Sequence, residues 1–397
     1  MQPNPVIDAI PAIMTQPSSP ASPDASPEAR TVLVLQGGGA LGAYQGGVYE
    51  ALDAAGFCPH WVAGISIGAV NAALIAGNPP ERRLAALRTF WDRASERVPF
   101  PAPFADGWGR KLFNEAAAAT VALTGIPGFF TPRWTVPSLT LPGLALPGTP
   151  EAISLYDTTP LRRTLEELVD FDLLNDGPMR FSVGAVNVLT GNFVYFDNRD
   201  RRIGPEHIMA SGALPPGFPP VMIDGEPYWD GGIVSNTPLQ YVLDERGEGA
   251  LLVFQVDLFS ARGMMPRTLA EAVQREKDIR FSSRTRLNTD IQTRIADLEE
   301  RLARLAARLP ESLHQSLQDD PDYIALTRRH SSGPVTILHL INRSEDYESQ
   351  GKDYEFSRAT LTGHWQAGLG DVTRSLASPR WHHRTPPTRG IVTLDLE

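Results

Sequence analysis

The chain has 397 residues, a length that suits two or three domains at about 150 residues each. Hydrophobic residues make up 42% of it and charged residues 21%, which is the composition of a globular protein and excludes a wholly disordered one. The single cysteine, Cys58, excludes an intramolecular disulfide scaffold, and no Cys/His cluster has the spacing of a zinc site. The formal net charge of −10 argues against nucleic acid as the main partner.

The first 30 residues predict a disordered tail. They contain seven Pro, five Ala and four Ser, and no basic residue precedes Arg30. The apolar run at 6–14 is short and is interrupted by Asp8 and Pro11, which does not fit a secretory signal. We therefore expect a cytoplasmic protein.

Strand-like and helix-like segments alternate after the tail. Residues 54–80 carry no charged side chain, but the Pro and Gly residues among them favour a buried strand, turn and helix over a membrane span. Strands are expected at 31–36, 61–64, 179–186, 193–196, 251–258 and 335–341, and helices end near residues 55 and 76. A hairpin turn is expected at Asp224-Gly225. The alternation predicts an α/β core with a mainly parallel sheet.

An apolar insertion at about 100–155 interrupts this pattern. Arg133 is the only charged residue between Ala116 and Pro150, and Pro-Gly pairs recur there, so neither a regular helix nor a regular strand is expected. Two interpretations stay open. The segment is a loop packed on the core, or it is a hydrophobic lid that covers an active site and contacts lipid.

The part from 263 to 397 is expected to form a mostly helical C-terminal domain of unknown role. Apolar residues recur every three or four positions from Leu287 to Leu309, which predicts one long amphipathic helix ended by Pro310. Residues 261–310 hold eleven basic and seven acidic side chains. We expect the apolar stripe to pack on the main domain, and a partner helix or an anionic membrane surface are the alternatives.

The sharpest local motif is Gly64-Ile65-Ser66-Ile67-Gly68, between an apolar strand and an apolar helix. In a G-x-S-x-G nucleophile elbow the serine stands at a tight strand-to-helix turn that small flanking residues permit. The N-terminus of the following helix favours a developing negative charge. The context therefore indicates a serine hydrolase.

A serine nucleophile needs a base, and Asp230 is the strongest candidate. It ends an apolar segment and precedes Gly231 and Gly232, which allow close backbone approach. None of the eight histidines lies in a recognisable catalytic setting.

The segment from Gly37 to Gly42 (GGGALG) directly follows the first strand. Its backbone N–H groups, uncovered by side chains, suit an oxyanion hole. The same residues fit a dinucleotide-binding G-x-G-x-x-G, which requires an acidic residue about 20 positions on. Residues 54–80 contain none, and the second strand ends at Ser66 instead.

In this order the glycine loop, the Ser66 elbow and the Asp230-Gly231-Gly232 segment resemble the signature of patatin-like phospholipases. The resemblance covers roughly residues 31–262. The segment 211–239 and the tail around Tyr354 resemble a bacterial subgroup with an additional C-terminal domain of unknown function. Many family members carry a basic residue after the glycine triplet, where this chain has Ala40.

The resemblance implies a three-layer α/β/α sandwich and calcium-independent hydrolysis of lipid acyl esters, in lipid catabolism or membrane lipid remodelling. It implies Ser66 as nucleophile and Asp230 as its base in a dyad without histidine. Gly37, Gly38 and Gly39 would lie near the oxyanion, and the motif-supporting glycines are Gly42, Gly64, Gly68, Gly231 and Gly232. No cofactor or metal is implied. The partner is a lipid or phospholipid, with peripheral contact at the inner membrane surface, and the oligomeric state stays open.

Two other functions remain open. An α/β-hydrolase with a Ser-Asp-His triad would need His339 or His364 as its base. A non-catalytic lipid-binding module would use the basic amphipathic helix as its working surface.

Overall fold

The computed structural model describes residues 29–104, 106–135, 145–283, 285–327, 333–343 and 351–396. The expected tail falls outside the described residues up to residue 28, as do residues 136–144 of the apolar insertion. Within these ranges, no helix combines the length and the apolar character needed to cross a bilayer.

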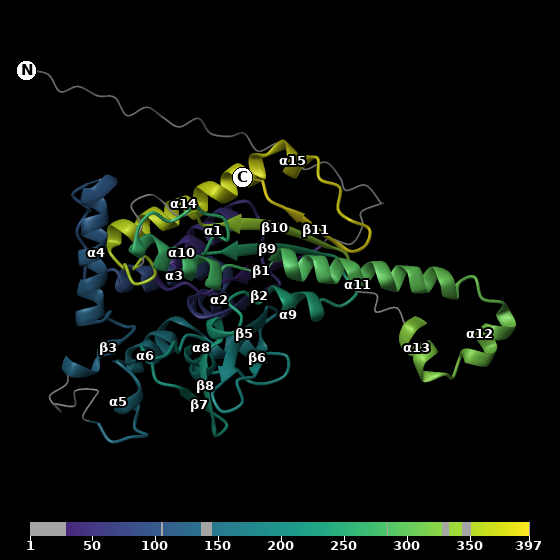
Figure 1. Cartoon of the computed structure of the whole chain (residues 1–397), viewed down its shortest axis with the longest axis horizontal. Coiled ribbons are helices and arrows are strands. Elements are labelled where there is room, and N and C mark those ends of the chain that lie inside the picture. Colours follow the sequence, from purple (N-terminus) through teal and green to yellow (C-terminus); the bar gives the residue numbers. More distant parts are fainter. Residues whose placement is uncertain are drawn as a thin grey trace, which may run out of the picture.

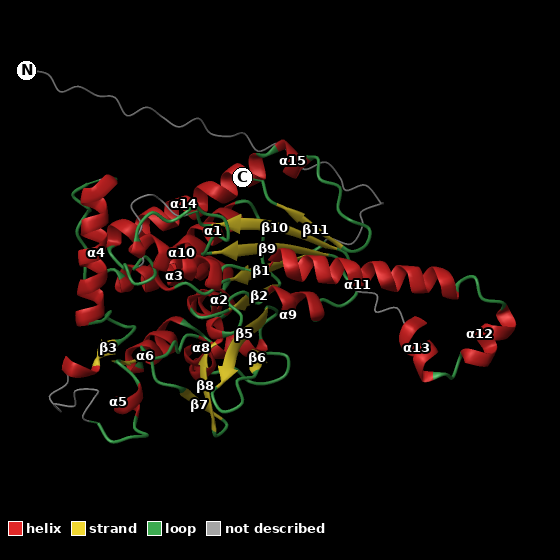
Figure 2. Cartoon of the chain, viewed as in Figure 1, coloured by secondary structure: helices red, strands yellow, loops and turns green. Residues whose placement is uncertain are grey.

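A nine-stranded sheet organises the described part of the chain (Figure 1, Figure 2). Its strand order is β11-β10-β9-β1-β2-β5-β8-β7, and β6 also pairs with β5. The strands from β11 to β5 run parallel, whereas β6, β7 and β8 are antiparallel to their neighbours. The strands are β1 (Arg30–Leu35), β2 (Trp61–Gly64), β5 (Arg180–Asn187), β6 (Phe193–Asp197), β7 (Val221–Ile223), β8 (Glu226–Asp230), β9 (Leu251–Asp257), β10 (Val335–Ile341) and β11 (Ile391–Leu394).

Strand β1 is apolar from Val32 to Leu35, where helices cover both of its faces. Leu33 and Leu35 pack in one core with α1 (Ala43–Ala54) and α2 (Ile67–Ala76), and Val32 and Val34 pack in another with α9 (Leu239–Asp244). A strand buried on both sides gains from an unbroken apolar run. The expected three-layer α/β/α sandwich with a mainly parallel sheet is confirmed.

The remaining elements surround this sheet. A 3-10 turn (Gly39–Gly42) leads from β1 into α1, and a two-residue pairing joins β3 (Thr131–Pro132) to β4 (Tyr156–Asp157). The other α-helices are α3 (Pro80–Ala94), α4 (Gly107–Thr124), α5 (Pro150–Ile153), α6 (Thr159–Leu168), α7 (Phe171–Asp176), α8 (Pro205–Ser211), α10 (Leu269–Phe281), α11 (Thr285–Ala306), α12 (Glu311–Leu317), α13 (Pro321–Thr327), α14 (Arg358–Ala377) and α15 (Pro379–His382). The hairpin expected at Asp224-Gly225 joins β7 to β8, and both turn residues have positive φ.

The C-terminal part is mostly helical, as expected, but it also extends the central sheet. Strand β10 pairs in parallel with β9 and β11. Helix α14 lies along α1, where a side chain at Gly47 would overlap the Trp365 carbonyl, and the Tyr44 hydroxyl donates to Asp371 at 2.6 Å. The sheet therefore runs across the boundary expected near residue 262.

The apolar stripe of α11 is exposed, so the expectation that it packs on the main domain is wrong for its described side chains. Ile291, Ile295, Leu298, Leu302 and Leu305 are each at least 37% exposed. The reason is the direction of the helix: α11 leads away from the sheet toward α12 and α13 at the far end of the molecule (Figure 1).

The described part of the apolar insertion is packed on the core in one place and exposed in another, and its role as a lid stays a prediction. Its beginning is a regular helix, α4, which continues to Thr124 because no glycine or proline follows Gly109 until Gly125. Phe129 and Phe130 pack against the core, whereas Trp108 and Leu112 on α4 are exposed. The expectation of a segment without regular helix is therefore wrong for residues 116–124.

Candidate active site

Ser66 stands in the sharp turn that the sequence predicts, directly after β2 and at the N-cap of α2. Its φ of 55° is a strained conformation for a residue with a side chain. The flanking glycines permit the turn, since a side chain at Gly64 would overlap the Gly68 carbonyl, and one at Gly68 would overlap the Leu35 carbonyl. The strand-turn-helix geometry presents the Ser66 hydroxyl at the carboxyl end of the sheet.

Asp230 ends β8 and is 2% exposed. Its Oδ1 accepts a hydrogen bond from the Gly232 N–H at 2.7 Å, and Asp230 and Ser66 line the same cavity. Burial raises the pKa of Asp230 to about 7, and the neighbouring Ser66 hydroxyl and Gly232 N–H lower it only in part. Among the described residues no lysine or arginine forms an ion pair with it. A carboxylate of this kind is a base poised near neutral pH.

The glycine loop lies against Ser66. The Gly37 N–H already donates to the Asn236 carbonyl at 3.2 Å, the Ala40 N–H to the Asp353 carbonyl at 2.9 Å and the Leu41 N–H to Gly38 at 3.2 Å. Within the described part of the chain, the N–H groups of Gly38 and Gly39 have no acceptor. Gly38 and Gly39 thus offer free donors, whereas Gly37 shapes the loop.

The other motif glycines hold these three elements close together. Gly42 packs on Ile67 of α2, and Gly231 packs on the Gly184 carbonyl of β5. A side chain at Gly232 would lie 2.9 Å from the Asn236 amide oxygen.

A cavity of about 330 Å³ opens beside Ser66 and Asp230. Its walls are largely aromatic and aliphatic, and they come from the apolar insertion, from the segment after α8 and from the C-terminal part. Among the residues that line it are Val121, Phe129, Phe130, Leu155, Leu214, Phe218, Phe259, Phe281, Tyr354 and Phe356. Such a cavity suits an apolar chain ending at the serine.

A family model described as "Patatin-like phospholipase" matches residues 33–243, more than half of the chain. The chain belongs to the patatin-like phospholipase family. A second model, described as "Patatin phospholipase", matches residues 279–388. Membership supports lipid hydrolase activity.

Two further comparisons add little to the family match. The crystal structure of VipD from Legionella pneumophila is similar at 14% identity and a TM-score of 0.33, over 87% of this chain and 68% of that one. No curated protein matches the chain.

In this patatin-like phospholipase, the two histidines considered for a triad lie elsewhere. His339 on β10 is 2.5 Å from the Asp257 carboxylate, and His364 is buried in α14, where burial lowers its pKa to about 4. No histidine is among the described residues that line the cavity beside Ser66.

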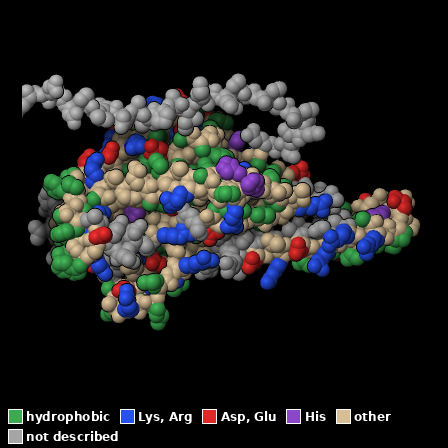
Figure 3. Space-filling model, turned by 90° about the horizontal axis from the view of Figure 1, so that it is seen from above, with side chains coloured by type: hydrophobic (Ala, Val, Ile, Leu, Met, Phe, Trp, Pro, Cys, Tyr) green, Lys and Arg blue, Asp and Glu red, His purple; other side chains and the backbone are tan. Residues whose placement is uncertain are grey.

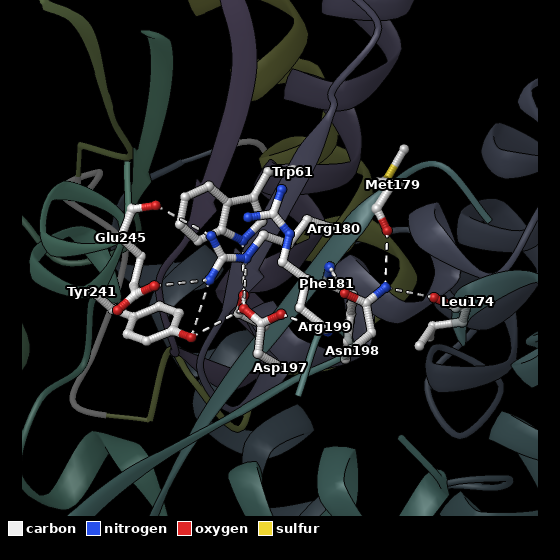
Figure 4. Close-up of polar contacts among 11 residues, drawn as sticks. Trp61, Leu174, Met179, Arg180, Phe181, Asp197, Asn198, Arg199, Tyr241 and Glu245 are labelled. Carbon is white, nitrogen blue, oxygen red and sulfur yellow. Dashed lines mark hydrogen bonds and ion pairs between the residues drawn. The ribbon is translucent and has the colours of Figure 1, made fainter. Parts of the chain in front are cut away.

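A second buried carboxylate, Asp197, lies near the opposite end of β5 (Figure 4). Its Oδ2 accepts from Arg180 at 2.7 Å, Ser182 at 2.6 Å and Tyr241 at 3.0 Å. The Arg180 guanidinium lies over the Trp61 ring, 3.9 Å from its centroid. This saturated network holds the sheet together and leaves Asp197 without free acceptor capacity on that oxygen.

The sequence motifs missed the polar residues that hold the glycine loop. Gln36 accepts from the Leu258 and Phe259 N–H groups at 2.6 and 2.9 Å, and Asn236 donates to the Gly37 carbonyl at 3.0 Å. Gln36 could have been found from the sequence, because it follows an apolar strand and a buried side-chain amide needs hydrogen-bond partners. No comparable pattern marks Asp353.

Proposed function

We propose that the protein hydrolyses carboxylic esters of lipids, with Ser66 as nucleophile and Asp230 as general base. The observation that carries the proposal is the pairing of a strained serine with a buried carboxylate that lacks a cationic partner. A structural carboxylate at this depth is usually paired with a cation. One that is not is free to take up a proton during a reaction.

In the proposed reaction, Asp230 accepts the Ser66 proton while Oγ attacks the ester carbonyl carbon. The carbonyl oxygen, which becomes negatively charged, accepts hydrogen bonds from the Gly38 and Gly39 N–H groups. Asp230 returns the proton to the leaving alcohol, and an acyl-Ser66 ester remains. Asp230 then takes a proton from a water molecule, whose oxygen attacks the acyl carbon. Asp230 passes this proton to the leaving Ser66 Oγ, the fatty acid is released, and both residues return to their starting state.

The test compares wild type with Ser66→Ala and Asp230→Asn on a short-chain fluorogenic ester and on a phospholipid panel without added calcium. We expect Ser66→Ala to abolish turnover and Asp230→Asn to lower kcat by about 10²–10⁴-fold, the usual contribution of a general base. Both variants should keep the wild-type circular dichroism spectrum. Full activity in folded Ser66→Ala would overturn the proposal.

His364→Gln and His339→Gln are the controls for a histidine triad. Retained activity in both supports the dyad, and loss of turnover in a folded histidine variant would favour the triad. Lipid binding without turnover of any ester by wild type would favour a non-catalytic binding module.

We further propose that the protein contacts an anionic membrane through the face between α4 and α10. Met264, Met265 and Leu269 are at least 73% exposed, and the Lys111, Arg262 and Arg267 side chains line the neighbouring groove of about 400 Å³. Hydrophobic side chains gather at the end of the molecule that holds α4 (Figure 3). At an anionic membrane, exposed apolar side chains insert below the lipid headgroups, and basic side chains beside them pair with the negatively charged headgroups.

Vesicle sedimentation tests this contact with phosphatidylglycerol-containing and pure phosphatidylcholine vesicles. Met264→Asp combined with Met265→Asp should weaken binding to the anionic vesicles at least tenfold and leave turnover of the soluble ester unchanged. The matched control is Leu298→Asp with Leu302→Asp on the exposed stripe of α11. Loss of binding in the α11 variant alone would contradict the proposed face.

A further inference from the structure

The C-terminal part reaches the catalytic cavity, although the first family match ends at residue 243. Phe281 at the end of α10 lines the same cavity as Ser66, together with Asp353 and Tyr354 from the segment before α14. The cavity is therefore built by both parts of the chain.

The main chain of Asp353 lies directly on the glycine loop. Its carbonyl accepts the Ala40 N–H at 2.9 Å, and a side chain at Gly39 would overlap the same oxygen. Gly39 has a φ of 55°. The Asp353 carbonyl thus takes up the Ala40 N–H and packs on Gly39. It lies next to the N–H groups of Gly38 and Gly39, which have no acceptor within the described part of the chain.

Two adjacent ion pairs hold Asp353 in this place. Lys277 on α10 is 2.5 Å from the Asp353 carboxylate, and the neighbouring Asp278 is 2.9 Å from Lys352. All four side chains are at least 85% buried. The order of the charges is Lys-Asp on α10 and also Lys-Asp on the segment, and each lysine faces the aspartate of the other element. A shift of the segment by one residue along α10 would therefore bring like charges together, which disfavours other registers.

The end of α10 is itself tied to the other side of the glycine loop. The Phe281 carbonyl accepts from Gln36 at 3.1 Å and from Asn236 at 3.0 Å. Asn236 also donates to the Gly37 carbonyl at 3.0 Å. Helix α10 therefore links the start of the loop, through Asn236, with its end, through Asp353.

We propose that the C-terminal part completes the oxyanion hole, with Lys277 and Asp353 as positioning residues that hold the Gly38 and Gly39 N–H groups in place. This inference rests on the proposed hydrolase function. A merely structural role would change stability. A positioning role also changes the transition state more than the bound substrate, because the donors act where charge develops.

Lys277→Met removes the cation and leaves the Asp353 carboxyl buried without it. We expect kcat for the short-chain ester to fall about 10–100-fold, the loss that a misplacement of about 1 Å causes, while KM stays within about twofold. Asp353→Asn, which keeps the size of the side chain, should show the same split. Lys277→Arg should recover at least half of the wild-type kcat.

Arg358→Ala is the matched control, since Arg358 forms a 3.0 Å ion pair with Asp92 in the same part of the chain without lining the catalytic cavity. It should leave kcat unchanged. Wild-type kcat in folded Lys277→Met or Asp353→Asn would overturn the inference. An equal loss in Arg358→Ala would also overturn it, because general loosening would then suffice.

Labelling by a fluorophosphonate separates this inference from the proposed function. If Ser66→Ala stays active, the hydrolase assignment itself fails. If Ser66→Ala is inactive and unlabelled while Lys277→Met is labelled at the wild-type rate, only the role of the C-terminal part fails. Slower labelling of folded Lys277→Met, with recovery in Lys277→Arg, is the result expected.

Discussion

Two buried aspartates flank strand β5 and are held in opposite ways. Asp197 pairs across the strand with Ser182, and Asp230 with Ala185. Asp197 is 1% and Asp230 is 2% exposed, so burial alone does not distinguish them. Asp197 has an arginine and two hydroxyl groups on one oxygen, whereas the Asp230 carboxylate accepts the Gly232 N–H and has no cationic partner among the described residues.

The difference shows that the partners of a buried carboxylate determine whether it has a structural role or can transfer protons. A carboxylate paired with a cation and with its lone pairs satisfied stays ionised and fixes the sheet. One that is buried without a cation has a raised pKa near the working pH and can exchange a proton. Asp197 therefore stabilises the sheet, whereas Asp230 is a candidate base.

Removing the cation beside Asp197 should give the largest change in stability. Arg180→Met leaves Asp197 buried and unpaired, and we expect the free energy of unfolding to fall by about 3–5 kcal/mol. The kcat per folded molecule should stay within about twofold, because Arg180 does not line the catalytic cavity. Urea titrations and kinetics at low temperature measure both quantities.

Arg202→Met is the control for this prediction, since Arg202 pairs with Asp176 at 3.4 Å on the surface. Its loss should cost less than about 1 kcal/mol. Equal stability of the two arginine variants would contradict the structural role given to the Asp197 network.

The pH dependence of catalysis should follow Asp230. Because the carboxylate is the active form and its pKa is raised to about 7, kcat/KM should fall about tenfold for each pH unit below that value, and about 100-fold between the plateau and pH 5. A pH–rate profile with a neutral soluble ester measures this. An apparent pKa near that of an ordinary aspartate would contradict the assignment of Asp230 as base.

The same raised pKa predicts that the ionised form of Asp230 destabilises the folded protein. Folded protein binds the Asp230 proton more tightly than unfolded protein does, so this group lowers stability as pH rises from about 4 to about 7. Asp230→Asn should therefore be about 2 kcal/mol more stable than wild type at pH 8, with a smaller gain at pH 4. Asp197→Asn should be destabilised at pH 8. Thermal melts at the two pH values test both signs.

The smallest effect concerns the hydroxyl of Tyr241. Tyr241→Phe removes one of the hydrogen bonds to Asp197 and keeps the ring stacked on Tyr195 at 4.0 Å. We expect a loss of about 1 kcal/mol and no change in kcat. A loss as large as that of Arg180→Met would show that the hydroxyl, and not the cation, holds the carboxylate.

The sequence predicted best those features that depend on residues adjacent in the chain. The apolar run of β1 predicted a strand buried on both faces, and the glycines around Ser66 predicted the turn, because both depend on residues adjacent in the chain. The elbow, the glycine loop and Asp230 lie together as expected, and their chemical roles stay predictions.

What the sequence did not predict depends on contacts between distant residues. Lys277 and Asp353 look like ordinary surface charges in the sequence, and only the fold brings them to Gly39 and Ala40. The exposed stripe of α11 was misplaced for the same kind of reason. Helical periodicity gives the apolar face of a helix but not what lies opposite it.

The strand order has a consequence for synthesis on the ribosome. Val32 of β1 pairs with Trp61 on one side and with Val253 on the other, and β9 is covered in turn by Val335 of β10. A chain emerging from its N-terminus thus carries β1 with the backbone N–H and C=O groups of one edge unpaired until β9 has been translated. Chains truncated near residue 262 would retain an open β9 edge, which is a template for aggregation.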